Sequence, residues 1–379
     1  MSIEWLVMQQ GERKGLESPS HPVLLMSRIR LARNLAGFSF PGWAKAAQRQ
    51  SVYDACKDAL AAIPQMSSSA HFEVGGLNDL EKQLLVEKHL ISKELCESRG
   101  SSGVTIAQGQ LMAVMINEED HLRIQVMRPD LDFDSLWADS SALDDELEKR
   151  LDYAFGPELG YLTACPTNLG TALRASAMLH LPALVLDKQM EKVVRAMNQI
   201  GIVARGLFGE ASDASGSIFQ ISNQQTLGES ETVIIRRIED VIRVVISHEW
   251  KARIRLFQGN AVKMFDRIGR AYGVLRGGHL ISSSEAMNLL SMMRLASDVH
   301  MLPVQVRDSV DRLIMEMQPA HMQIGSGKTL APGERDEMRA DLMRRTFEEI
   351  PHPDPSKLSF EDSGLDSGSS VDDVKADEE

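Results

Sequence analysis

The sequence predicts an α+β protein, in which a region of mixed strands and helices is followed by an all-helical region. Strand-like and helix-like hydrophobic patterns interleave from residue 22 to about residue 255. From about Asn260 onward only helical spacing is found. The last 29 residues, 351–379, are rich in Ser, Asp, Gly and Pro and carry nine acidic side chains, so this tail is expected to be disordered.

The first half of the mixed region combines strands with amphipathic helices. The predicted elements are a strand over 22–34, helices over 43–63 and 77–95, and two strands within 103–127 around a short charged connection. Asn78 is suited to cap the second helix, and Pro64 ends the first. Leu122, Ile124 and Val126 show the alternation of a half-buried strand.

The second half leads into a long helix. The predicted elements are a helix over 134–155, a short strand over 160–164, a helix carrying Arg174 with a cap at Asn168 or Thr171, a strand over 216–224, and a long helix over 229–257. The helical region that follows includes helices over 282–300 and 332–349.

The composition is that of a globular protein with a sizeable core. Of the 379 residues, 43% are hydrophobic and 25% are charged. No apolar run approaches the ~18 residues that cross a bilayer, and the N-terminus lacks the features of a signal peptide, so a cytoplasmic location without a membrane partner is expected. Cys56, Cys96 and Cys165 have no CxxC or His companions, which fits a reducing compartment and predicts no metal site. The net charge of −13 argues against nucleic-acid binding.

Arginines form the first group of candidate site residues. They adjoin predicted strand ends, helix starts or Gly-rich loops, at Arg28, Arg30, Arg123, Arg174 and Arg205. Arg28 and Arg30 are two residues apart on a strand and therefore point to the same face. Because a guanidinium stays charged and binds phosphate oxygens in pairs, a convergent set would suit a triphosphate. Taken singly, each arginine is more often a surface residue or a structural ion-pair partner.

Two other segments carry candidate catalytic carboxylates. In "NEEDH", Asn117 to His121, a carboxylate at the end of an apolar strand could orient a cationic acceptor and take its proton; a charged hairpin turn is the alternative. The loop "VARGLFGEASDASGS" contains Glu210. Loops of this composition often close over substrates, and a plain surface loop is the alternative.

Together, "SRIRLARN", "NEEDHLR", "CPTNLGT", "RAS" and "RG..GE" resemble the motifs of the phosphagen (guanidino) kinase family, in that family's order. The resemblance implies an antiparallel-rich sheet flanked by helices, with ATP and Mg²⁺ as cofactors. It assigns nucleotide binding to Met26, Ser27, Arg28, Ile29, Arg30, His89, Arg123, Arg174, Ala175, Ser176, Ala177, Met178, Arg205, Gly206, Leu207, Phe208, Gly209 and Glu210. Met26 stands where many relatives have a serine.

The resemblance also implies how the acceptor is held. Glu119 would bind the guanidinium of a substrate arginine and act as the base, and Glu210 would clamp its other side. Cys165 would lie against the guanidinium as a thiolate that tunes the acceptor. A buried apolar cysteine is the alternative for Cys165.

Two features resemble bacterial protein-arginine kinases in particular. The arginine strand begins at about residue 22, which leaves no room for the N-terminal helical domain of small-molecule guanidino kinases. The segment "RDEMRA" resembles a motif that lines an allosteric phosphoarginine pocket and comprises Arg335, Asp336, Glu337, Met338, Arg339 and Ala340. A charged, solvent-facing helix is the alternative for this segment. The expected domains are an N-terminal extension over 1–21, a catalytic domain over 22–254, a helical domain over 255–350 and an acidic tail over 351–379.

The sequence therefore predicts an ATP-dependent protein-arginine kinase that acts on proteins with exposed arginines. We expect a homodimer, with an activator protein and the protein-degradation machinery as further candidate partners. One alternative is a kinase for free arginine or another small guanidino compound. The other is a non-catalytic phosphoarginine adaptor, which would have no use for Glu119, Glu210 and the arginine set.

Overall fold

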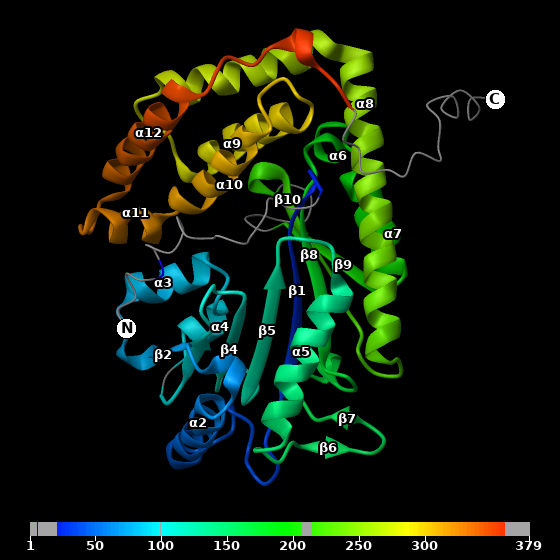
Figure 1. Cartoon of the computed structure of the whole chain (residues 1–379), viewed down its shortest axis with the longest axis vertical. Coiled ribbons are helices and arrows are strands. Elements are labelled where there is room, and N and C mark those ends of the chain that lie inside the picture. Colours follow the sequence, from blue (N-terminus) through cyan, green and yellow to red (C-terminus); the bar gives the residue numbers. More distant parts are fainter. Residues whose placement is uncertain (1–5, 7–20, 99, 207–213, 361–379) are drawn as a thin grey trace, which may run out of the picture.

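A single antiparallel sheet organises the catalytic region of the computed structural model, which describes residues 6, 21–98, 100–206 and 214–360 (Figure 1). The strand order is β2-β3-β4-β5-β1-β8-β10-β9, and every pairing is antiparallel. The strands are β1 (Leu24–Arg33), β2 (Ala70–Glu73), β3 (Gly103–Ile106), β4 (Met112–Ile116), β5 (Leu122–Arg128), β8 (Leu173–His180), β9 (Ile202–Gly206) and β10 (Ile218–Asn223). A separate ribbon pairs β6 (Phe155–Gly156) with β7 (Gly160–Tyr161). The predicted α+β class with an antiparallel sheet is confirmed.

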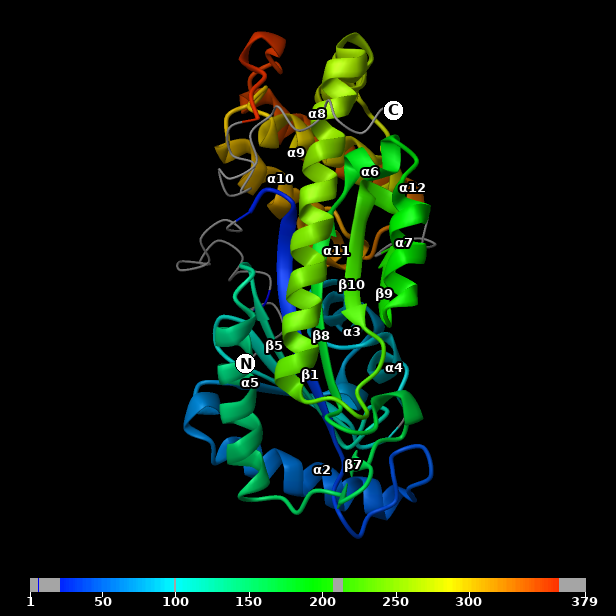
Figure 2. The ribbon, with the colours of Figure 1, turned by 90° about the vertical axis from the view of Figure 1, so that its right-hand side faces the viewer.

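Apolar side chains on one face of this sheet form the main core. Ile29 and Leu31 of β1 pack there with residues from α2 (Ala46–Ala61), α5 (Phe133–Glu148) and α8 (Glu231–Gly277). Helix α8 runs along the sheet in Figure 2 and contacts β8 and β10. On the other face, a second apolar cluster covers only the β2 end of the sheet, beneath α3 (Asp79–Glu87) and α4 (Lys93–Cys96). The polar face of the central strands is therefore left for a site.

Arg33 lies on the apolar face, where it forms a structural ion pair. Its guanidinium donates to Asp144 of α5 at 2.6 Å and lies 3.5 Å from the centre of the Tyr161 ring. Its side chain is only 2% exposed, and a buried charge of this kind is tolerated because it is paired and fully hydrogen-bonded.

Several local predictions were wrong, and positive backbone φ angles explain most of them. Residues 103–127 form three strands because Gly109 and Gln110, with φ of 86° and 61°, turn the chain between β3 and β4. The helix expected over 77–95 is split into α3 and α4 at His89, with φ of 58°, although Asn78 caps α3 as predicted. Strands β2 and β9 and helix α7 (Met190–Gln199) were not predicted.

The helix predicted to carry Arg174 is instead the central strand β8. Its odd-numbered positions, among them Leu173, Ala175 and Ala177, enter the core, as the period of a strand requires. Gly170 and Ala172, with φ of 97° and 52°, interrupt any helix before it begins. The expected strand over 160–164 contains only the two residues of β7.

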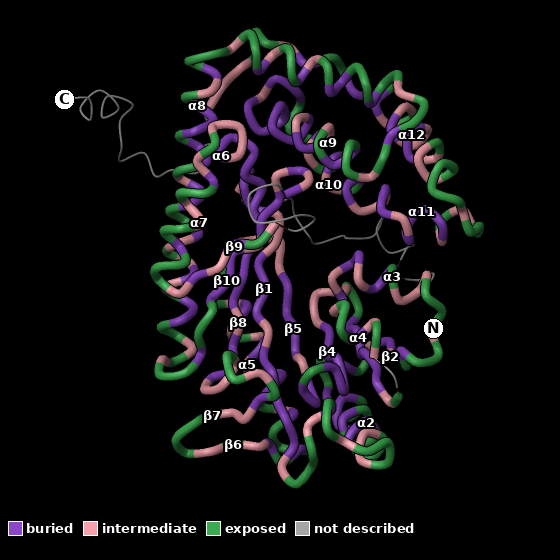
Figure 3. The backbone as a smooth tube through the Cα atoms, turned by 180° about the vertical axis from the view of Figure 1, so that it is seen from behind, coloured by how far each residue is buried: buried purple, intermediate pink, exposed green. Residues whose placement is uncertain are grey.

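The helical region forms an arch over one end of the sheet (Figure 1). Helices α9 (Ser283–Asp298), α10 (Gln305–Glu316), α11 (Pro319–Ser326) and α12 (Pro332–Glu349) pack with the second half of α8 around their own core, which is drawn in purple in Figure 3. Helix α8 thus belongs to both regions, and its one non-helical residue is Asn260, with φ of −157°. No helix of the described residues is long and apolar enough to cross a membrane.

Residues 351–360 are ordered against this helical core, so the expectation of disorder from residue 351 was wrong for this segment. The backbone amides of Asp354 and Ser359 donate to the carbonyls of Met301 and Val299 at 2.8 and 3.1 Å. Leu358 also packs on the core. The rest of the acidic tail, 361–379, lies outside the described residues.

Buried polar contacts join the helical region to the sheet. Arg253 of α8 donates to Asp298 of α9 at 3.0 Å, and Arg294 of α9 donates to the carbonyl of Leu24 at 3.2 Å, at the start of β1. At a second contact, the carboxylate of Glu87 on α3 accepts from the backbone amides of Ala320 and His321 in α11 at 2.9 and 3.1 Å. These contacts fix the arch relative to the polar face.

Candidate active site

The register of the sheet places the five predicted arginines on its polar face. Arg30 of β1 lies directly opposite Arg174 of β8, and Arg123 of β5 lies opposite Ala32, two residues along β1. Arg205 of β9 lies opposite Gln220 of β10, whose neighbour across β8 is Met178. Directly opposed residues share a face, so these guanidinium groups, drawn from four strands, surround one area of the sheet.

Several of these guanidinium groups are buried without an ion-pair partner among the described residues. Arg28 is 8% exposed and donates only to neutral groups, Gln125 at 3.4 Å and Gln220 at 3.0 Å. The Nε atoms of Arg28, Arg30 and Arg174 have no hydrogen-bond partner among the described residues. Such donors, buried and unsatisfied, are costly unless an acceptor joins them.

Burial and repulsion between neighbouring arginines disfavour the charged forms of these side chains. Burial, together with the charges of Arg123 and Arg174, lowers the pKa of Arg28 to about 10. Burial and the neighbouring arginines also lower the pKa of Arg30 and of Arg174. An anion with several negative oxygens would relieve this repulsion, so the area fits a triphosphate.

Other residues assigned to the nucleotide divide between the two faces. Met26, Ser176 and Met178 share the face of the arginines, whereas Ser27, Ile29, Ala175 and Ala177 alternate to the opposite face, so their side chains point away from the site. His89 is close to Arg28; burial and that charge lower its pKa to about 4. Leu207, Phe208, Gly209 and Glu210 lie outside the described residues, so the loop carboxylate is not placed.

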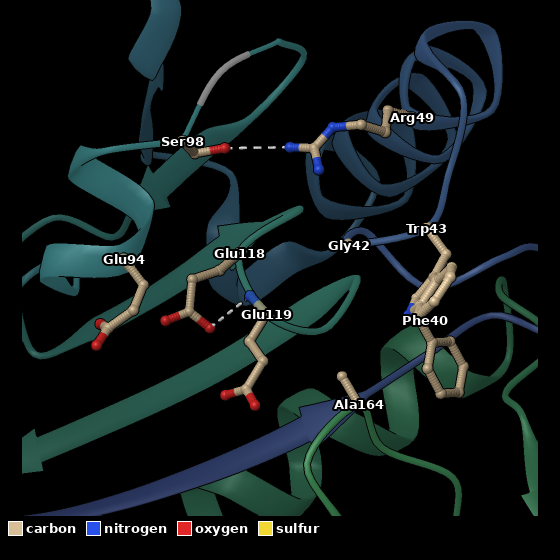
Figure 4. A pocket seen from close by; sticks show the side chains of 9 residues that line it. All are labelled: Phe40, Gly42, Trp43, Arg49, Glu94, Ser98, Glu118, Glu119 and Ala164. Carbon is tan, nitrogen blue, oxygen red and sulfur yellow. Dashed lines mark hydrogen bonds between the residues drawn. The ribbon is translucent and has the colours of Figure 1, made fainter.

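An acidic pocket of about 400 Å³ borders the arginine face (Figure 4). It is lined by Phe40, Gly42, Trp43, Arg49, Glu94, Ser98, Glu118, Glu119 and Ala164. Glu118 forms an ion pair with Arg123 at 2.5 Å and is 1% exposed, whereas Glu119 is 40% exposed and 3.7 Å from Arg123. Glu119 is therefore the more accessible carboxylate of the "NEEDH" pair.

The pKa of Glu119 is raised. Burial is the main cause, and the negative charges of Asp120, Glu118 and Glu94 add to it, against the opposing effect of Arg123. A raised pKa makes this carboxylate a stronger base, which is what removing a proton from a guanidinium requires.

The "NEEDH" hairpin also positions the predicted cysteine. Asp120 accepts from the side chain of Asn34 at 2.6 Å and from the backbone amide of Ala164 at 2.7 Å, next to Cys165. The thiol of Cys165 lies 3.0 Å from the hydroxyl of Thr167. Cys165 and Glu119 both act electrostatically on Arg174, so the acceptor residues and the arginine face adjoin.

The predicted phosphoarginine motif begins helix α12, and its two arginines differ. Arg339 is 1% exposed and donates to the carbonyls of Met317 and Ile281 at 3.1 and 2.8 Å, which makes it a structural residue. Arg335 is half-buried and donates to the carbonyl of Leu330 at 2.9 Å. Two other residues of the motif, Glu337 and Met338, line a second pocket of about 560 Å³, together with Glu316, His321, Met322, Gly325, Glu334, Asp341, Leu342 and Arg345.

Several residues of the site were not predicted from the sequence. Gln125 and Gln220 hold Arg28, and Gln125 could have been found because it follows Arg123 on the same alternation. Glu94 and Trp43 come from a short helix and a loop that carry no motif. Only the fold brings them to the pocket.

Comparisons with known proteins define the class to which the fold belongs. Residues 51–252 match the family model "ATP:guanido phosphotransferase, C-terminal catalytic domain". The chain also resembles the solved structure of lombricine kinase, with 24% identity and a TM-score of 0.54 over 62% of this chain and 68% of that one. A taurocyamine kinase from Schistosoma mansoni gives 21% identity and a TM-score of 0.56 over 73% of this chain and 46% of that one. The matched residues and the fold are those of a phosphotransferase of the ATP:guanido class.

Closer relatives define the branch. Residues 261–358 match the model "Protein-arginine kinase McsB C-terminal domain". The protein-arginine kinase of Moorella thermoacetica is 42% identical over 86% of this chain and 94% of its own length. That of Symbiobacterium thermophilum is 42% identical over 89% and 97%. The chain belongs to the protein-arginine kinase family.

Proposed function

We propose that the protein transfers the γ-phosphoryl group of ATP to a guanidino nitrogen of arginine residues in proteins. The observation that carries the proposal is the contact between a face of five arginines and a pocket lined by three glutamates. The first suits a triphosphate and the second suits a guanidinium, so the two substrates would meet at their border. The relatives named protein-arginine kinases support the choice of acceptor.

The residues act mainly by position and charge. The arginines hold the triphosphate and stabilise the charge of the transferring group. Glu119 orients the substrate guanidinium and accepts a proton, while a guanidino nitrogen bonds to the γ-phosphorus and the bond from that phosphorus to the leaving ADP oxygen breaks. Glu210 clamps the other side of the guanidinium, and Cys165 adjusts its charge. Among the described residues no group of three His, Cys, Asp or Glu could hold a metal. Mg²⁺ would be held by the triphosphate oxygens and would supply further neutralisation of their charge.

We further propose that phosphoarginine regulates the enzyme through the pocket beside α12. Glu334, Glu337 and Asp341 there suit the guanidinium part of such a ligand, and Arg345 suits its phosphoryl group. His321 lines this pocket and lies 2.9 Å from Glu87, two residues before His89. The carbonyl of His89 accepts from Gln125, which holds Arg28, so a chain of contacts joins the two sites.

The partners are part of the same proposal. They comprise proteins with exposed arginines, a second copy of the chain, an activator protein and the protein-degradation machinery. The three cysteines are free thiols, which fits the reducing cytoplasm that we propose as the location.

Incubation with γ-labelled ATP and Mg²⁺ tests the function. We expect acid-labile label on a basic protein, and its loss in Glu119→Ala. Label found only on free arginine would favour the small-molecule kinase instead. Binding of phosphoarginine without transfer to either acceptor, in the presence of candidate activators, would favour the adaptor.

A further inference from the structure

Trp43 is an exposed aromatic residue at the acidic pocket and belongs to none of the apolar clusters formed by the described residues. Its side chain is 90% exposed, more than any other large apolar residue in the described part of the chain, yet it lines the pocket. A solvent-exposed tryptophan does not provide the stabilisation that burial of its apolar surface normally gives to a fold. Figure 4 shows Trp43 and Phe40 across the pocket from Glu94, Glu118 and Glu119.

The loop that carries Trp43 is fixed to both ends of the "NEEDH" segment. The ring nitrogen Nε2 of His121 lies 3.0 Å from the carbonyl oxygen of Ser39, and the Phe40 ring meets the same imidazole edge-on at 6.2 Å. Arg49 donates to the carbonyl of Pro41 at 2.9 Å and to that of Asn117 at 3.2 Å. The aromatic loop is thereby held in a set position relative to Glu119.

Exposure increases from the base of the pocket to its rim. The side chain of Glu118 is 1% exposed, that of Glu119 is 40% exposed, and Trp43 is 90% exposed. A guanidinium bound at the carboxylates therefore places the main chain of its arginine toward the open side, where Trp43 stands. An apolar residue next to that arginine would meet the indole ring.

We propose that Trp43 is a specificity-determining residue that packs against an apolar neighbour of the phosphorylated arginine in the substrate polypeptide. The inference rests on the proposed protein-arginine kinase function and adds a sequence preference to it. The contact removes apolar surface of both partners from water. It lies outside the arginine face, so it affects the binding of the polypeptide and leaves the binding of ATP unchanged.

Kinetics with two matched peptides test this assignment. Each peptide carries one arginine, flanked by leucines in the first and by glycines in the second. We expect the wild-type protein to prefer the leucine peptide by about fivefold in kcat/KM, mainly through KM, because one apolar contact of this size is worth that much. In Trp43→Ala the ratio falls to about one, with the KM for ATP unchanged, and Trp43→Phe restores most of it.

Phe155→Ala is the matched control, because Phe155 is 59% exposed and lies away from the pocket on β6. This variant keeps the wild-type ratio. Equal kcat/KM for both peptides in the wild type, or an unchanged preference in Trp43→Ala, would overturn the role of Trp43 alone. A change of oligomeric mass in Trp43→Ala would overturn it too, since the ring would then serve an interface. If an activated sample transfers phosphate to neither peptide and modifies no protein, this result would instead contradict the proposed function.

Discussion

Replacing Arg28 by methionine should leave the nucleotide-free protein as stable as before, or more stable, while removing ATP binding. Arg28 is buried, and its pKa falls from the ordinary arginine value to about 10, so holding its charge costs about 3 kcal/mol at 1.36 kcal/mol per pKa unit. Because the folded-state pKa is the lower one, this cost is fully present below about pH 10 and disappears as the pH rises toward the ordinary arginine pKa. The substitution also removes hydrogen bonds to Gln125 and Gln220, worth about 1 kcal/mol each. The net expectation is a gain of about 1 kcal/mol.

Arg33→Met is the matched control on the same strand. Arg33 is also buried, but it is paired with Asp144, and removing it would leave that carboxylate unpaired at a cost of about 3–5 kcal/mol. Urea denaturation measures the two free energies of unfolding, and thermal shift with and without ATP measures binding. Arg28→Met should lose the ATP-induced shift. A loss of stability as large as in Arg33→Met, or a preserved shift, would refute the electrostatic account of the site.

Three other substitutions have distinct expected outcomes. Glu94→Gln removes a negative charge that helps to raise the pKa of Glu119, so the acidic limb of the rate profile should move to lower pH; an unmoved limb would count against Glu119 as the base. Glu87→Ala leaves two amides of α11 without their acceptor and should cost about 2–4 kcal/mol in urea unfolding, whereas an unchanged midpoint would mean that this contact does not hold the arch. Arg339→Ala should destabilise the helical region by about 2 kcal/mol or more, while Arg345→Ala should spare stability and weaken activation by phosphoarginine; equal effects on stability would contradict the structural role of Arg339.

The residues of the arginine face could be predicted from the sequence, but the secondary-structure element that carries Arg174 could not. Residue type and motif order point to Arg28, Arg30, Arg123, Arg174 and Arg205. Arginine keeps its charge when it is buried, and buried arginines are rare unless they are paired or bind a ligand. Local pattern, however, placed Arg174 on a helix. Its strand is decided by pairing with β1 and β10 and by the turn at Gly170, which are tertiary effects.

The lining of the acidic pocket was even harder to predict from local sequence. Glu119 was found from its motif, whereas Glu94 and Trp43 reach the pocket from segments with no local signal. Arg339 shows the opposite case, since it belongs to a recognisable motif and yet is buried and bonded to two backbone carbonyls and to Asp336. Contacts between residues far apart in the sequence determine the surroundings of Glu94, Trp43 and Arg339. Local spacing does not predict such contacts.

The most direct test of the central claim is to locate the phosphoryl group on a modified protein. A basic substrate protein, incubated with the wild-type chain, ATP and Mg²⁺, would be digested under neutral conditions and analysed by mass spectrometry with fragmentation that preserves phosphorus–nitrogen bonds. We expect phosphoarginine at internal arginines, and none with Glu119→Ala. Phosphate confined to hydroxyl side chains, or equal phosphoarginine with Glu119→Ala, would contradict it.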